Sequence, residues 1–224
     1  MLFVLLVQAG LWMGLTRACD LVIDSAPILT WRRADPDAAL GHAPAHPPHP
    51  LLLGYRLHTL LCCGTGLPLL FRLSRANAHD APFARPLLEL AVQRFALRAS
   101  PTSGAFGCGY WGLKLIAWIH TTLGAQAVIP WNPGRQKRRD GLPPTWTAEE
   151  LGKRPSIERF LGRVLVFFRL QRPPVFGSSA VETRVALTYA AAWGIALAAW
   201  QAGRPDLIRS PRLVLAHVWE GMGF

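Results

Sequence analysis

Two apolar runs joined by a glycine turn constrain the fold of this 224-residue chain more than any other feature. Residues 51–63 (LLLGYRLHTLLCC) and 67–76 (LPLLFRLSRA) flank the turn Gly64-Thr65-Gly66. Such strand-length runs on either side of a short glycine-containing loop are typical of a β-hairpin. The chain is therefore expected to contain a sheet with this hairpin in it.

An earlier run, residues 19–29 (CDLVIDSAPIL), is apolar and β-branched around the acid Asp24. This composition predicts a buried strand that ends in a turn at Ser25 and Pro27. Asp24 would then lie at the end of that strand. We expect this strand and the two strands of the hairpin to be consecutive in one sheet.

Downstream of the hairpin, helical and strand-like patterns alternate. Asp80 is placed to cap a helix whose apolar residues recur at helical spacing. The expected elements are a helix over 79–99, a weak strand over 100–109, a helix over 110–123, a short strand over 125–130, and helices over 156–169 and 179–201. The proline-rich residues 32–50 are expected to be a loop. This order predicts an α/β protein with a mixed central sheet flanked by helices.

The chain carries 24 Lys and Arg against 13 Asp and Glu, a formal net charge of +11. Such an excess attracts polyanions, and nucleic acid is the first candidate partner. A cluster of cations, Arg135, Lys137, Arg138 and Arg139, is expected to contact phosphates. The alternatives are a solvated basic loop and a surface rich in arginine for no functional reason.

Two apolar segments are the candidates for a membrane span or an export signal. Residues 2–15 lack a preceding positive charge and are interrupted by Gln8, and residues 185–200 are shorter than a membrane-spanning helix requires. These features favour a cytoplasmic protein, with a secreted or membrane-attached protein as the less favoured alternative. The four cysteines form no CxxC pair, and a zinc site at His42, His46 and His49 is disfavoured by the prolines among them.

Asp24 and Glu158 are the candidate catalytic acids. Phosphodiester cleavage in a ribonuclease-H-like fold uses carboxylates from the first strand, the fourth strand and a later helix to hold two magnesium ions. The predicted order of elements is that of this fold, and Asp24 and Glu158 occupy the first and third of those places. The structural alternatives are a strand-end acid that caps a turn and a first-turn acid that balances the helix dipole.

Four stretches in order resemble the DDE transposases of bacterial insertion sequences. LVIDSAPI is similar to the first catalytic Asp motif, and GYRLHTLLCCGTGLPLLFRLSRANAHD to the hairpin of the family. AQAVIPWNPGRQKRR is similar to its late strand and basic loop, and RPSIERFLGRV to its catalytic Glu helix. The resemblance implies a ribonuclease-H-like core over residues 20–202, a remnant of an N-terminal region over 1–19 and a C-terminal tail over 203–224.

The resemblance also implies function: DNA binding, cleavage and strand transfer in transposition, with double-stranded DNA of the element ends and the target as partner. A homodimer in a synaptic complex and a cytoplasmic, nucleoid-associated location would follow. Asp24 and Glu158 would be catalytic and would bind the cofactor, Mg²⁺ or Mn²⁺ in a two-metal site. The residues expected to contact DNA are Arg135, Lys137, Arg138, Arg139, Arg154, Arg159 and Tyr110.

The chain departs from the family most clearly at the second acid, where Gly107 stands in place of an Asp. The adjacent Cys108 offers a soft thiolate, which suits Mg²⁺ poorly, and Asp80 is expected to cap a helix instead. Leu151 and Leu165 also replace a Tyr and a Lys of the family pattern. We expect an impaired enzyme, and the alternative is a non-catalytic DNA-binding remnant of a transposase.

Overall fold

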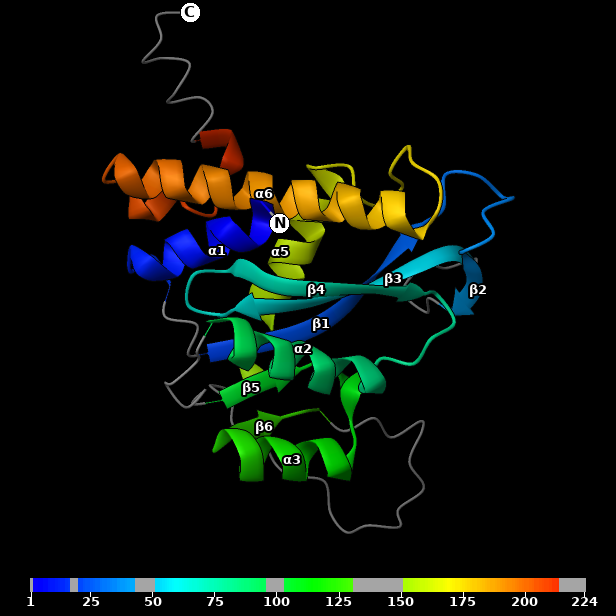
Figure 1. The fold of residues 1–224 in the computed structure, drawn as a ribbon, viewed down its shortest axis with the longest axis horizontal. Coiled ribbons are helices and arrows are strands. Elements are labelled where there is room, and N and C mark those ends of the chain that lie inside the picture. Colours follow the sequence, from blue (N-terminus) through cyan, green and yellow to red (C-terminus); the bar gives the residue numbers. More distant parts are fainter. Residues whose placement is uncertain (1, 17–19, 43–50, 96–102, 131–150, 214–224) are drawn as a thin grey trace, which may run out of the picture.

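The computed structural model describes residues 2–16, 20–42, 51–95, 103–130 and 151–213. They form an α/β fold in which helices flank one mixed six-stranded sheet, as predicted (Figure 1). The largest hydrophobic cluster runs from Phe3 near the N-terminus to Ala196 in the last long helix, and two small clusters lie apart from it.

The sheet is mixed because a four-stranded antiparallel part continues into a parallel part. The strands are β1 (Asp20–Leu29), β2 (Ala39–His42), β3 (Leu51–Cys62), β4 (Leu67–Arg75), β5 (Ser103–Phe106) and β6 (Gln126–Val128). Their order is β2-β3-β1-β5-β6, and β4 pairs with the same edge of β3 as β2. β1 and β3 pair antiparallel, as do β3 and β4, whereas β5 runs parallel to both β1 and β6. The prediction of three consecutive strands in one sheet is confirmed.

The predicted end of β1 is wrong, because the strand continues through Ser25 and Pro27 to Leu29. Leu29 donates its N–H to the carbonyl of Gln171, away from β3. Pro27 lies two residues earlier, so its nitrogen points to the same edge of β1. β5 pairs with that edge only as far as Ile23, so no strand lies beside Pro27 there. A proline at such an unpaired edge costs no hydrogen bond of the sheet. Asp24 therefore lies in the middle of a central strand.

The predicted loop over residues 32–50 is wrong at Ala39–His42, which form the short strand β2 against the start of β3. Gly41 lies directly against the backbone of Ala76 and has no room for a side chain. Periodicity cannot reveal a four-residue strand next to a proline-rich stretch, since the pattern is too short.

The helices follow the sequence periodicity closely. They are α1 (Leu2–Trp12), α2 (Ala81–Phe95), α3 (Leu113–Leu123), α5 (Pro155–Val166) and α6 (Ser178–Gln201), with single 3₁₀ turns η1 (Cys108–Tyr110) and η2 (Pro205–Leu207). α6 ends at Gln201, and Gly203 two residues later has a positive φ of 70°, which suits a residue without a Cβ. Of the helices in the described ranges, none is long and apolar enough to cross a membrane.

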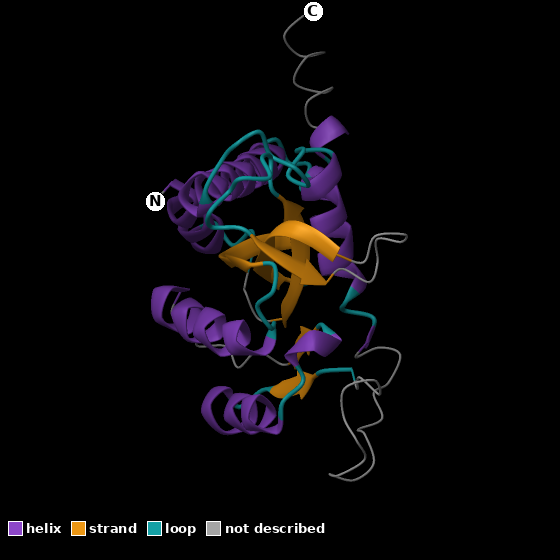
Figure 2. Cartoon of the chain, turned by 90° about the vertical axis from the view of Figure 1, so that its right-hand side faces the viewer, coloured by secondary structure: helices purple, strands orange, loops and turns teal. Residues whose placement is uncertain are grey.

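Neighbouring residues of β3 show which helices cover which face of the sheet. The ring of His58 stacks on Phe83 of α2, whereas the hydroxyl of Thr59, the next residue, bonds to Tyr189 of α6 at 2.6 Å. Successive side chains of a strand point to opposite faces, so α2 and α6 lie on opposite sides. Phe160 of α5 packs on Tyr189 and places α5 on the α6 side, across the sheet from α2 and α3 (Figure 2).

The two tryptophans of α6, Trp193 and Trp200, differ in burial. The ring of Trp193 is fully buried, and its indole N–H donates to the carbonyl of Pro68 at 2.6 Å. This bond fixes α6 to the start of β4. Trp193 is thus a core residue, while Trp200 lies 36% exposed near the end of the same helix.

Candidate functional site

Asp24 lies on the face of the sheet that α5 covers. It pairs in register with Thr59 of β3, and residues directly opposite in an antiparallel pair share a face. Its carboxylate accepts the N–H of Ser25 at 2.8 Å, and its side chain is 20% exposed. Burial raises the pKa of Asp24 above its usual 3.8. The hydrogen bond from the Ser25 N–H and the charge of Arg154 both lower this pKa, but they offset only part of the rise. The ionised carboxylate thus lies in a place that disfavours its charge.

Gly107 lies directly against the Asp24 carboxylate. It follows the end of β5, and its N–H donates to the carbonyl of Ile23 at 3.0 Å. A Cβ built on Gly107 would meet the Asp24 Oδ1 atom. The backbone at Gly107 has φ −62° and ψ 150°, a conformation open to any residue, so nothing in the backbone requires glycine there. An acid at position 107 would place a second carboxylate beside the first.

Arg154 and Glu158 reach the same place from the start of α5. Arg154 Nη2 lies 3.8 Å from Asp24 Oδ2 and 3.4 Å from Glu158 Oε1. The Glu158 side chain is 57% exposed and belongs to the first turn of α5, where the helix dipole favours a carboxylate. The fold therefore brings together positions 24, 107, 154 and 158, which the resemblance to transposases predicts to lie in one site.

These residues do not supply what two magnesium ions require. Of the three positions, Gly107 has no side chain, and the guanidinium of Arg154 lies within 4 Å of both remaining carboxylates. Over the described residues, no group of three or more His, Cys, Asp and Glu could hold a metal ion. A magnesium pair needs several oxygen ligands that converge on one point. In this chain a cation of its own, Arg154, lies close to both acids instead.

Tyr110 is wrongly predicted to contact DNA. Its side chain is fully buried on the other face of the sheet, and its hydroxyl lies 2.9 Å from His58 Nδ1. The other ring nitrogen of His58 lies 2.9 Å from the Ser74 hydroxyl. Burial raises the pKa of Tyr110 far above its usual value, so the group stays neutral. Tyr110 is a core residue whose polar end is satisfied inside the protein.

Asp80 lies at the edge of this buried network. Its carboxylate accepts a hydrogen bond from Arg56 Nη1 at 3.2 Å and lies 3.8 Å from His58 Nδ1. Its negative charge also raises the pKa of Asp24, so the two acids are close enough to interact through the sheet. The sequence predicts a helix cap at Asp80 and carries no sign of the pairing with Arg56.

The basic residues are only partly described. Arg159 is exposed on α5. Arg135, Lys137, Arg138 and Arg139 lie outside the described residues, as do His46 and His49 of the disfavoured zinc site. Three further arginines, Arg163, Arg209 and Arg212, were not singled out from the sequence, although the spacing of Arg159 and Arg163 places both on one side of a helix.

Replacing Asp24 with Asn is expected to stabilise the protein at neutral pH. Folding raises the pKa of Asp24 above the 3.8 of the unfolded chain. Ionised Asp24 therefore lowers the stability of the folded protein at high pH, and this loss of stability disappears below pH 3.8. An Asn keeps an oxygen for the Ser25 N–H. The Tm should rise by a few degrees near pH 7, since about 1 kcal/mol moves the Tm of a domain of this size by roughly 2–4 °C.

Thermal unfolding across a pH series checks this expectation. The gain should shrink as the pH falls toward 3.8, and Glu158→Gln, at a largely exposed side chain, should change the Tm little. A lower Tm for Asp24→Asn at neutral pH would mean that the attraction of Arg154 outweighs the burial of Asp24.

In comparisons with known proteins, no family model, no curated protein and no solved structure matches the chain.

Proposed function

We propose that this chain binds DNA through a ribonuclease-H-like core of the transposase type, and that its DNA-strand cleavage is impaired because Gly107 replaces the second catalytic acid. The observation that carries the proposal is the convergence of three distant positions. Gly107 lies against Asp24, and Arg154 connects Asp24 to Glu158. Those are the positions at which the transposase resemblance expects the three catalytic acids.

The arrangement of the elements supports the proposal. β1, which carries Asp24, is central in the sheet, with β3 antiparallel on one side and β5 parallel on the other. Gly107 follows β5, and α5 presents Glu158 to the same face. An acid on a central strand, a position after the neighbouring parallel strand and an acid on a later helix are the three places where the ribonuclease-H-like fold holds its metal ligands.

The charge of the protein supports DNA as the partner. The net charge is +11, and Arg159, Arg163, Arg209 and Arg212 form no salt bridge with any described carboxylate. Cations without acidic neighbours leave a positive potential that attracts the phosphates of nucleic acid. Arg154 differs from these four, since Asp24 and Glu158 already engage its guanidinium.

Duplex binding by fluorescence anisotropy tests the DNA partner. Each phosphate contact adds about −0.9 to the slope of log affinity against log salt, so four contacts predict a fall of roughly a hundredfold between about 50 and 200 mM salt. The measurement needs only a labelled duplex of arbitrary sequence. An affinity that does not change with salt would contradict the proposal.

A plasmid-nicking assay separates the two forms of the proposal. An impaired recombination enzyme leaves slow nicking of supercoiled DNA with Mg²⁺ or Mn²⁺ that Glu158→Ala removes. A purely DNA-binding remnant shows salt-dependent binding and no nicking with either ion. Nicking that Glu158→Ala leaves unchanged would show that the acids identified above do not form the site.

A further inference from the structure

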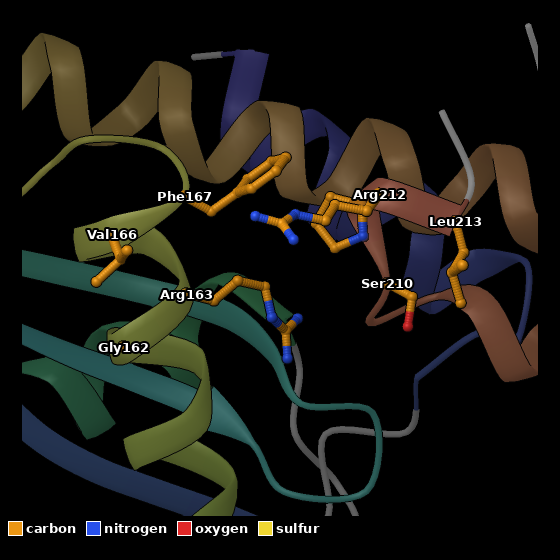
Figure 3. A pocket seen from close by; sticks show the side chains of 8 residues that line it. Gly162, Arg163, Val166, Phe167, Ser210, Arg212 and Leu213 are labelled. Atoms are coloured by element: carbon orange, nitrogen blue, oxygen red, sulfur yellow. The ribbon is translucent and has the colours of Figure 1, made fainter. Parts of the chain in front are cut away.

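A pocket of about 450 Å³ lies between the C-terminal half of α5 and the segment that follows η2 (Figure 3). It is on the α5 side of the sheet but is separate from the acids at the start of that helix. Its lining residues are Gly162, Arg163, Val166, Phe167, Ser210, Pro211, Arg212 and Leu213. Volumes of about 300–1,000 Å³ are typical of sites for small molecules or single chemical groups of a larger ligand.

The pocket carries positive charge without a counter-charge. Arg163 reaches from α5 toward residues 210–213, and Arg212 reaches back toward α5 (Figure 3). Arg209 lies close by, where its Nε donates to the Thr65 carbonyl at 2.7 Å and anchors the segment to the β3–β4 turn. In the described parts of the chain no carboxylate forms a salt bridge with any of these three arginines, and no acid lines the pocket.

The positive charges around the pocket repel one another, and the pKa of Arg163 reflects this repulsion. Burial lowers the pKa of the Arg163 guanidinium, and the charges of Arg209 and Arg159 lower it further. Like charges at this spacing repel, so a bound anion would relieve repulsion as well as form charge-assisted hydrogen bonds. The pocket is therefore suited to an anionic group such as a phosphate.

The other walls of the pocket are apolar. Val166 is 73% exposed and Phe167 36% exposed, and Pro211 and Leu213 lie opposite them. The Arg212 guanidinium lies 5.8 Å from the centre of the Phe167 ring, which combines a cation with an aromatic surface. The ligand that fits both halves of the pocket has an anionic group next to a flat, partly apolar one.

We propose that this pocket binds one nucleotide of single-stranded DNA, with its phosphate at Arg163 and Arg212 and its base against Phe167. The inference rests on the proposed DNA binding and adds a strand-specific contact to it. In a duplex the bases are stacked and their faces are covered, whereas a single strand offers each base to an aromatic side chain. A pocket of this size admits one nucleotide and excludes a double helix.

The test compares binding of a labelled short oligothymidylate and a labelled duplex by anisotropy. The Arg163→Ala/Arg212→Ala variant should bind the single strand at least tenfold more weakly, with a salt slope shallower by about 1.4, because each lost phosphate contact of a single strand removes about 0.7. Phe167→Leu, which keeps an apolar side chain without a ring, should weaken single-strand binding about tenfold and leave the salt slope unchanged. Arg163→Ala/Arg212→Ala should also lower duplex affinity, but by less than it lowers single-strand affinity, because the duplex loses only the general attraction of its phosphates. Phe167→Leu should leave duplex affinity within twofold.

Arg94→Ala/Lys114→Ala is the matched control, because it removes two exposed cations from α2 and α3 on the other side of the sheet. It should leave single-strand binding within twofold. The side chains of Arg212 and Phe167 are partly or largely exposed, and the Tm of each variant shows whether it is folded.

Three outcomes would overturn the inference. Unchanged single-strand affinity in both pocket variants would mean that the pocket is not a DNA contact. Equal losses for the single strand and the duplex would mean that the arginines act only as general positive charge. If the native protein binds neither form of DNA, the proposed function fails together with the pocket, whereas duplex binding without an effect of the pocket variants overturns the pocket alone.

Discussion

Gly107→Asp is expected to make the stability of the protein depend on Mg²⁺ or Mn²⁺ and to produce metal-dependent nicking of supercoiled DNA. The new carboxylate would lie beside Asp24, since a Cβ at position 107 already meets that side chain. The obstacle is the end of a side chain rather than backbone, so Asp24 can move aside. Two adjacent carboxylates repel each other without a cation, and they form a site for a hard divalent ion when one is present.

The stability change is measured first because it does not require activity. Without metal, Gly107→Asp should unfold at a lower temperature than the native protein. Metal at about a hundred times its Kd adds roughly 2.7 kcal/mol, and at roughly 2–4 °C per kcal/mol this corresponds to a rise in Tm of about 5–10 °C. The native protein should show no comparable rise.

Two control variants test whether the effect of Gly107→Asp comes from the size of the new side chain and whether it needs Glu158. Gly107→Asn has nearly the same size and no charge, so it should show neither the metal-dependent rise nor nicking. Gly107→Asp combined with Glu158→Ala should lose the nicking that Gly107→Asp acquires. If Gly107→Asp gains metal-dependent stability but no nicking, the site binds metal without catalysing cleavage, and the recombination form of the proposal is wrong.

The contact between Arg154 and the two acids influences this experiment. Arg154 Nη2 lies 3.8 Å from Asp24 and 3.4 Å from Glu158, where a metal ion would compete with it. Gly107→Asp with Arg154→Gln should therefore bind metal more tightly than Gly107→Asp alone. Weaker metal binding in the double variant would mean that Arg154 positions the acids for the ion.

Lowering the pH from about 7 to about 4 is expected to remove roughly 3 kcal/mol of folding free energy through His58 alone. Burial holds the pKa of His58 at about 4 in the folded protein, below the usual 6.5. The folded state therefore keeps the ring neutral while the unfolded chain binds a proton. The stability due to the neutral ring is complete above 6.5 and is lost as the pH falls from 6.5 to about 4.

The surroundings of His58 explain why the ring resists protonation. It is fully buried, stacked on Phe83 and bonded to Tyr110 and Ser74. Asp80, 3.8 Å away, favours the charged ring, but Arg56 next to it opposes this and burial outweighs both. A neutral imidazole can donate through one nitrogen and accept through the other, which suits two hydroxyl partners.

Urea unfolding between about pH 4 and pH 7 measures this effect. His58→Gln is expected to be less stable at neutral pH, but its stability should fall much less steeply on acidification. His120→Gln, at an exposed position on α3, should keep the native slope. An unchanged slope in His58→Gln would assign the acid sensitivity to other groups.

The sequence by itself determined the main elements of the fold. The hairpin of β3 and β4, the helices α2 and α6 and the weak strand β5 follow from hydrophobic period, glycine turns and capping residues, which are local properties. Asp24, Gly107, Arg154 and Glu158 were also singled out from the sequence, through the resemblance to transposases. Their placement around one point required only that the elements pack in the expected order.

Only the tertiary structure decided what surrounds these residues. Pairing with β3 carries β1 past Pro27 and places Asp24 in mid-strand, and sheet geometry turns Tyr110 inward to His58, 52 residues away in the sequence. The pocket arises because the turn at Thr65 holds Arg209 and so brings residues 210–213 to the end of α5. Such contacts join segments far apart in the chain, and neither periodicity nor motif spacing carries information about them.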